Sequence, residues 1–187
     1  RMALSMDDAD ATTQVFVGST HTPILFFSSL GQVYYLKLYK LPLGSPQAKG
    51  KALVNLLPLK KGETITNIMA LPENTEEWKD LYILFATAQG GIRRNSLADF
   101  SYIPSNGKIA IKLQDDDTLI GVRLAKEENH IFLATSQGKA IRFPVEKLRV
   151  FKSRSSDGVI SMRLANGDHI VGITILEGIE TTQEYRE

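Results

Sequence analysis

The sequence contains no cysteine, so it can form neither a disulfide framework nor a thiolate metal site. It also has no apolar run close to the roughly 18 residues that a membrane-spanning helix needs. The first residues, RMALSM, lack the apolar core of a secretion signal. These absences favour a cytoplasmic domain without membrane attachment, and they argue against a secreted or membrane-spanning protein.

Signatures of catalysis are missing as well. Gly90-Gly91 stands without the G-x-x-x-x-G-K-[ST] pattern of a phosphate-binding loop. The histidines His21, His130 and His169 have no second ligand at the spacing of a zinc motif. Asp115–Asp117 offers carboxylates to a divalent cation, but a solvated turn is the favoured interpretation, because adjacent strand residues point to opposite faces. We therefore expect no catalytic residue, no metal and no cofactor in this chain.

Charge is present in balance but is unevenly distributed. The 22 basic residues nearly equal the 21 acidic ones. Between Ala11 and Gly62 there are six lysines and no acid, and between Gly138 and Arg154 six basic residues accompany the single acid Glu146. Charge separated in this way along a repeating chain predicts charge separated in space.

A short unit of strand, glycine turn and strand occurs three times. Its turn glycines are Gly31, Gly90 and Gly138, at spacings of 59 and 48 residues. A second glycine follows each of them after 17 to 20 residues, at Gly50, Gly107 and Gly158. Apolar and polar residues then alternate over 52–56, 109–113 and 160–164, and this alternation predicts half-buried strands.

Each unit closes with a polar turn before a further strand begins, so we predict units of four antiparallel strands. The predicted boundaries are 13–63, 64–118 and 119–169, with the first strand of a further unit at 170–177. About fifty residues and four strands per unit are typical of a β-propeller blade. We expect an all-β, pinwheel-like fold with little helix, in which about three blades form an open arc. An irregular β-sandwich is the alternative, but it does not explain the threefold glycine register.

Extra length in the second unit falls at residues 72–80. The proline, asparagine and acids of this stretch predict a surface loop. Trp78 within it either anchors the loop on the core or contacts a partner.

Basic residues recur near both glycines of each unit. The candidates for phosphate contact are Lys37, Lys49, Lys51, Arg93, Arg94, Lys108, Arg142, Lys152 and Arg154. Equivalent loops of a propeller lie on one surface, so they predict a curved positive track that binds duplex DNA. Two alternatives stay open: a protein-interaction or scaffold arc whose lysines are merely solvated, and an autonomous enzyme. Because an open arc exposes an unpaired edge, we also expect some self-association.

Three stretches resemble the C-terminal domain of the DNA gyrase A subunit. They are Ile24–Tyr34, Val54–Leu59 and Gly107–Leu113. The similarity extends over essentially the whole chain, and the related topoisomerase IV domain is the second choice. The resemblance implies about three internal blades of a six-bladed propeller whose basic rim wraps duplex DNA in support of ATP-dependent negative supercoiling.

The same resemblance implies that the catalytic residues and cofactors belong to other domains or subunits. It implies that ATP and magnesium act on other domains or subunits, and that the partners are a gyrase B subunit together with a second copy of the gyrase A chain. The family's wrapping motif Q-R-R-G-G-K-G is absent, and Gln47–Lys51 is only a degenerate counterpart. The family's cleavage tyrosine lies in another domain, so none of the tyrosines of this chain inherits that role. The tyrosines of this chain are Tyr34, Tyr35, Tyr39, Tyr82, Tyr102 and Tyr185.

Overall fold

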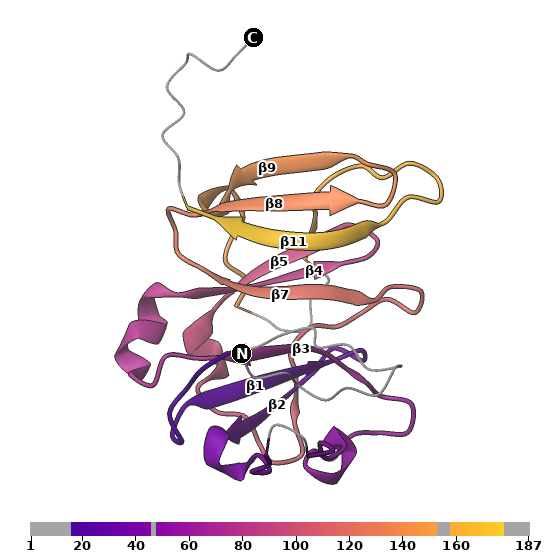
Figure 1. Cartoon of the computed structure of the whole chain (residues 1–187). Coiled ribbons are helices and arrows are strands. Elements are labelled where there is room, and N and C mark those ends of the chain that lie inside the picture. The colour runs from indigo at the N-terminus through magenta and orange to yellow at the C-terminus, as the bar shows by residue number, and fades with distance from the viewer. Residues whose placement is uncertain (1–15, 46–47, 153–157, 178–187) are drawn as a thin grey trace.

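Three small antiparallel sheets stack in chain order to form the molecule (Figure 1). The computed structural model describes residues 16–45, 48–152 and 158–177. Strands in this described part are β1 (Pro23–Ser28), β2 (Gln32–Lys37), β3 (Ile65–Ala70), β4 (Tyr82–Thr87), β5 (Gly91–Ser96), β6 (Lys108–Ile109), β7 (Leu119–Ala125), β8 (His130–Thr135), β9 (Ala140–Pro144), β10 (Val159–Ile160) and β11 (Ile170–Leu176). The all-β prediction is confirmed.

The helical segments in the described part of the chain are all short 3-10 helices. They are η1 (Leu38–Lys40), η2 (Leu53–Asn55), η3 (Thr75–Asp80), η4 (Leu97–Phe100) and η5 (Val145–Lys147). Three of them, η1, η4 and η5, directly follow the second strand of a sheet's hairpin. They turn the chain away from the sheet at the same point each time.

Each sheet is built around one hairpin and one returning strand. The strand orders are β3-β1-β2-β6 in the first sheet, β10-β5-β4-β7 in the second and β11-β8-β9 in the third. β3, β7 and β11 each pair with the first strand of their hairpin. The outer strands β6 and β10 come from the connection that follows the next hairpin along the chain.

The sheets therefore do not follow the contiguous boundaries 13–63, 64–118, 119–169 and 170–177. β3 lies beyond the predicted end of the first unit, yet Ile24 pairs with Ala70 in the first sheet. β11, predicted to begin a further blade, pairs with β8 and completes the third sheet. The reason is that the first strand of each hairpin has a second free edge, and the chain returns to fill that edge after a long excursion.

The alternating stretches after the second glycines form less strand than predicted. After Gly107 and Gly158 only two residues are extended and paired, in β6 and β10. The stretch 52–56 forms no strand and contains η2 instead. β6 and β10 form because each pairs with the edge of the preceding sheet, whereas 52–56 pairs with no strand among the described residues.

The glycine turns are confirmed. Gly31, Gly90 and Gly138 have φ values of 72°, 90° and 80°. Each glycine N–H donates to the carbonyl oxygen three residues earlier, at 3.0, 3.1 and 3.1 Å. These positive φ values favour glycine over any residue with a Cβ.

Two apolar layers fill the spaces between the sheets. The first joins Leu25 and Phe27 of the first sheet to Phe85 of the second, with the two phenyl rings 5.7 Å apart. The second joins Leu84 to Ile131 and other residues of the third sheet. The middle sheet is therefore covered on both faces, which sets the environment of every side chain on β4 and β5.

Trp78 is an anchor of the 72–80 loop. Its side chain is 4% exposed and belongs to the first apolar layer. The indole N–H donates to the Pro72 carbonyl oxygen at 2.9 Å. Of the two alternatives drawn from the sequence, the structure supports packing on the core.

Candidate nucleic-acid interface

Arg93 and Arg94 lie in the interior, contrary to the prediction that they contact phosphate. They are 0% and 2% exposed, and a phosphate group of a duplex cannot reach them. They were chosen because basic residues recur near the glycines of each unit, in loops expected to share one surface. β5 instead lies within the middle sheet, whose two faces are both covered, so the arginines are enclosed whichever way they point.

Arg94 ties the second sheet to the third. Its guanidinium donates to the carbonyl oxygens of Val145 and Leu148, both at 3.0 Å, and forms an ion pair with Glu127. The guanidinium carbon also lies 3.7 Å from the centre of the Tyr82 ring. Arginine suits such a buried junction because its planar guanidinium presents several N–H donors in a fixed geometry.

Arg93 acts on the opposite face of the same strand. Its guanidinium lies 5.1 Å from the centre of the Phe85 ring and donates to the Ala110 carbonyl oxygen. Both arginines therefore bind backbone and aromatic groups of neighbouring segments. Their contribution is to stability rather than to a ligand.

Lys108 is partly committed to the protein as well. Its ammonium group donates to the carbonyl oxygens of Asp99 and Tyr102 at 3.0 and 2.8 Å. It also lies 6.0 Å from the centre of the Phe100 ring. These contacts hold the connection that leads into β6, and they leave the charge less available to a phosphate.

The other candidates differ in exposure. Lys49, Lys51, Arg142 and Lys152 are exposed, while Lys37 is half-buried. Arg154 lies outside the described residues. The predicted site residues are therefore of three kinds: exposed cations, a lysine that binds carbonyl oxygens of the protein itself, and buried arginines that stabilise the fold.

A lysine-rich segment runs from the end of β2 through the first sheet's long connection. We define the lysine surface as Lys37, Lys40, Lys49, Lys51, Lys60 and Lys61. The one acidic residue between positions 16 and 72 is Glu63, whose side chain is 5% exposed. Lys40, Lys60 and Lys61 were missed as candidates, although the acid-free run of six lysines was the signal that contained them.

Glu63 is held inside by hydrogen bonds. Its carboxylate accepts from the Tyr34 hydroxyl at 3.0 Å and from the Lys60 N–H at 2.7 Å. Burial alone would raise the pKa of Glu63, but hydrogen bonds from Ser28, the Lys60 N–H and Tyr34 together hold it below its ordinary value of 4.5. Burial and the same carboxylate raise the pKa of Tyr34 to about 12. The one negative charge of this segment is thus buried, although it lies close enough to Lys60 for the lysine's charge to help lower its pKa.

A second basic region lies on the third sheet and the connection after it. Lys139, Arg142, Lys147, Arg149 and Lys152 are all exposed. Glu146 lies 3.8 Å from Lys147, and the Arg149 guanidinium lies 4.3 Å from the centre of the Phe151 ring. The connection of the second sheet between these regions carries the exposed or half-exposed acids Asp115–Asp117.

Those aspartates serve a turn. Asp117 accepts from the Gln89 N–H at 3.0 Å and from the Thr118 N–H at 2.8 Å. Within residues 16–45, 48–152 and 158–177, no group of three or more potential metal ligands comes together. No helix in this part of the chain is long and apolar enough to cross a membrane.

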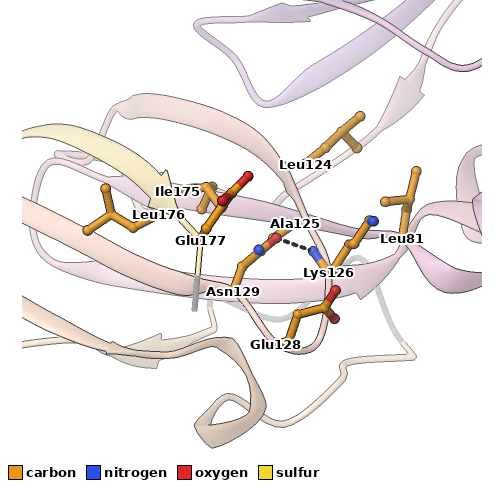
Figure 2. Close-up of a pocket in the computed structure, with 9 residues that line it drawn as sticks. All are labelled: Leu81, Leu124, Ala125, Lys126, Glu128, Asn129, Ile175, Leu176 and Glu177. Carbon is orange, nitrogen blue, oxygen red and sulfur yellow. Dashed lines mark hydrogen bonds between the residues drawn. The ribbon is translucent and has the colours of Figure 1, made fainter. Parts of the chain in front are cut away.

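The hollow between the ends of β7 and β11 does not suit an anion. It has a volume of about 510 Å³, and Leu124, Ala125, Ile175 and Leu176 form much of its wall. Figure 2 shows Glu128 and Glu177 at this hollow with Lys126, whose N–H donates to the Asn129 side chain at 2.7 Å. Two carboxylates beside one ammonium group oppose phosphate binding, so the lysine surface remains the candidate interface.

Comparison with known proteins agrees with this fold. The family model for the DNA gyrase C-terminal domain, a β-propeller, matches residues 22–72, 81–126 and 129–177. These three segments together cover more than half of the chain. Each one contains a hairpin and its returning strand, which is the grouping seen in the three sheets.

Curated relatives carry the same family name. The DNA gyrase A subunit of Rickettsia bellii is 64% identical over 187 residues, which are all of this chain and 21% of that protein. The DNA gyrase A subunit of Staphylococcus aureus is 39% identical over 90% of this chain and 19% of its own length. The chain thus spans about a fifth of the length of these relatives.

Solved structures show the same architecture. The crystal structure of the C-terminal domain of DNA topoisomerase IV matches with a TM-score of 0.80 and 25% identity, over 92% of this chain and 53% of that one. A DNA gyrase A C-terminal domain matches with a TM-score of 0.67 and 26% identity, over 83% and 48%. The propeller prediction is confirmed, and the chain belongs to the family of DNA gyrase C-terminal β-propeller domains.

Proposed function

We propose that this chain binds duplex DNA through the lysine surface and bends it along the arc of sheets. The observation that carries the proposal is the concentration of six lysines on a segment whose single acid is buried. A duplex presents one negative charge per about 1.7 Å of its axis, so a surface with an excess of basic residues attracts it independently of sequence.

Bending the duplex has a cost that phosphate contacts must offset. A turn of 40–90° over a short site costs on the order of 1–6 kcal/mol. The exposed cations of the third sheet and of the connection after it, including Arg142 and Lys152, extend the positive potential beyond the lysine surface. Arg93 and Arg94 contribute to this function only by holding the sheets that carry the surface.

In the full-length protein, this binding would support ATP-dependent negative supercoiling by a type IIA topoisomerase. Catalysis, ATP and magnesium would belong to other domains or subunits. The partners would be a gyrase B subunit together with a second copy of the gyrase A chain, in the cytoplasm. This chain's own role is to hold and curve the DNA segment. Its family membership supports that assignment.

The test is duplex binding measured by fluorescence anisotropy across a series of salt concentrations. The variant combines Lys60→Gln with Lys61→Gln, and the matched control combines Lys79→Gln with Lys126→Gln, which removes two exposed lysines outside the lysine surface. If both lysines contact phosphate, the slope of log affinity against log salt falls by about 1.8, at about 0.9 per contact. The control keeps the slope of the unmodified chain.

Two outcomes would contradict the proposal. An equal loss in the control pair would show a general charge effect without a defined surface. A slope near zero for the unmodified chain would remove DNA as the ligand and favour the protein-interaction arc instead.

A further inference from the structure

The chain turns sharply just before each of the three returning strands. These turns span residues 60–63 before β3, 114–117 before β7 and 165–168 before β11. In each turn the N–H of the fourth residue donates to the carbonyl oxygen of the first residue at 3.0 Å. The fourth residue is an acid in all three turns: Glu63, Asp117 and Asp168. The turns therefore share a hydrogen bond and differ in the side chains that they carry.

The turn before β3 is the one of the three that presents lysines. Its first two residues are Lys60 and Lys61, which are both exposed and belong to the lysine surface. We call them the lysine pair. The other two turns, with the sequences QDDD and ANGD, carry no basic residue. A cation on a defined turn loses less conformational freedom on binding phosphate than one on a loose segment, so what holds this turn bears on duplex binding.

Glu63 binds its own turn through its side chain as well as its backbone. The carboxylate oxygen Oε2 accepts from the Lys60 N–H at 2.7 Å, so this residue closes the turn at both ends. The aspartates of the other two turns accept from an N–H of the hairpin turn beside them, at Gln89 and Gln137. The longer glutamate side chain instead reaches back along the turn that carries the lysine pair.

A buried tyrosine fixes this carboxylate in place. The Tyr34 hydroxyl donates to both oxygens of Glu63 at 3.0 Å, and the two residues are 3% and 5% exposed. The Tyr34 ring packs in the apolar cluster around Phe26 and Leu57. It also fills the space beside Gly107, where an added Cβ would lie 2.5 Å from the ring. The ring is therefore held by the core of the first sheet, and its hydroxyl holds the carboxylate.

Both flanks of the turn are anchored independently of this carboxylate. On one side, Leu57 is 4% exposed and packs in the apolar cluster. On the other side, the Ser29 N–H donates to the Thr64 carbonyl oxygen at 2.8 Å, and the Thr64 N–H donates to the Ser29 hydroxyl at 3.2 Å. Loss of the acceptor that Glu63 supplies would therefore loosen the lysine pair without detaching the segments on either side.

We propose that Glu63 positions the lysine pair for contact with the phosphates of duplex DNA, and that Tyr34 holds Glu63 in place. This role rests on the proposed function, and it gives a buried acid a favourable part in binding an anion. The property that acts is the side-chain oxygen as a hydrogen-bond acceptor rather than the negative charge. By charge alone a carboxylate beside the lysine pair would weaken phosphate binding, so the two effects of Glu63 have opposite signs.

The decisive experiment compares two variants that remove the same charge. Glu63→Gln keeps an oxygen where Oε2 accepts from both Tyr34 and Lys60. The double variant, Tyr34→Phe with Glu63→Leu, replaces both partners by apolar groups of similar size. Duplex binding is measured by fluorescence anisotropy across a salt series. Glu63→Gln should keep the salt slope of the unmodified chain, whereas the double variant should lower it by about 0.9–1.8, which corresponds to one or two lost phosphate contacts.

Two glycine variants disturb the turn without touching the core. Gly62 has a φ of 80°, and a Cβ placed on it meets nothing within 4 Å. Gly167 is the matched control in the turn 165–168, with a φ of 76° and equally open surroundings. Gly62→Ala strains the backbone beside the lysine pair and should lower the salt slope, whereas Gly167→Ala should leave it unchanged. Neither variant changes the charge, and this pair tests the proposal even if the double variant does not fold.

A cycle with the lysine pair separates positioning from a general loss of stability. In a chain that already carries Lys60→Gln and Lys61→Gln, adding Tyr34→Phe and Glu63→Leu should lower the salt slope no further, because the contacts are already gone. A further fall would show that the buried pair supports the domain as a whole. That result would overturn the positioning role.

Amide hydrogen exchange at Lys60 follows the turn without DNA. Exchange should be slow in the unmodified chain and in Glu63→Gln, and at least about tenfold faster in the double variant, since one hydrogen bond to the Lys60 N–H is lost. Equal exchange rates in all three would overturn the proposal.

The two proposals fail in different ways. If Lys60→Gln with Lys61→Gln lowers the salt slope but the double variant and Gly62→Ala do not, the positioning role is wrong and the proposed function stands. If removing the lysine pair leaves the slope unchanged, the lysine surface is not the DNA site, and the positioning role is overturned with it.

Discussion

Arg94 and Arg142 occupy the same register position in neighbouring sheets but lie in opposite environments. Each stands four residues after a turn glycine and opposite an apolar residue of the first hairpin strand. Arg94 is 2% exposed and bound to Val145, Leu148 and Glu127, whereas Arg142 is exposed. What differs is the presence of a further sheet, and this comparison shows that the neighbour, rather than the residue, determines the role.

The largest expected effect on stability comes from removing the guanidinium group of Arg94, and the matched change at Arg142 should have little effect. Arg94→Ala leaves two buried carbonyls without their donor, at about 1–3 kcal/mol each, so we expect a loss of about 2–5 kcal/mol in the free energy of unfolding. Arg142→Ala should change stability by less than about 0.5 kcal/mol, as for other surface positions. Urea denaturation measures the free energy of unfolding of both variants. Equal losses in the two variants would remove the distinction between the sheets.

The turn glycines extend the same comparison to the backbone. Gly31→Ala must place a Cβ 2.2 Å from the Ile111 carbonyl oxygen at a φ of 72°, so strain and overpacking together should cost about 2–4 kcal/mol. Gly138→Ala meets open space at a φ of 80° and should lose only the conformational part, about 1–2 kcal/mol. Thermal unfolding compares them. A larger loss at Gly138 than at Gly31 would contradict the role of the Ile111 carbonyl contact.

The carboxylates beside the turns give the smallest and most pH-dependent effect. The lowered pKa of Glu63 means that its charged form contributes stability above pH 4.5, and that this contribution is lost as the pH falls through the lowered value. Glu63→Gln should cost about 1–2 kcal/mol at pH 7 and much less at low pH, since the charge-assisted hydrogen bonds are then absent in both proteins.

Asp168 is the matched case in the third sheet. Burial tends to raise its pKa, but hydrogen bonds from Gln137, Thr135, Ser136 and His169 hold it below 3.8. Asp168→Asn should reproduce the acid dependence with a smaller amplitude, because this carboxylate is less enclosed than that of Glu63. Denaturation followed between pH 3 and pH 7 tests the pair, and a Glu63→Gln effect that is constant with pH would refute the electrostatic account.

Sequence patterns predicted the repeating features well. The glycine turns, the strands next to them and the scarcity of helix follow from residues that act locally, such as a glycine at positive φ and alternating apolar side chains. The patterns assigned β3, β7 and β11 to the wrong units, because strand pairing joins residues distant in the chain. No local signal states which edge a returning strand will fill.

The candidate site shows the same division. The acid-free run of lysines was visible in the sequence, and it contains the surface that the structure leaves exposed. Arg93 and Arg94 were assigned to phosphate because basic residues recur near the glycines of each unit, in loops expected to lie on one surface. Their burial depends on sheets packed against both faces of β5, which composition cannot reveal.

The sequence by itself therefore determined the repeat, the turns and the distribution of charge along the chain, since each depends on residues close together in the chain. Tertiary structure alone decided which arginines are buried and which strand completes which sheet. Burial and pairing depend on what packs alongside a residue, and in this fold that neighbour often comes from a distant part of the chain.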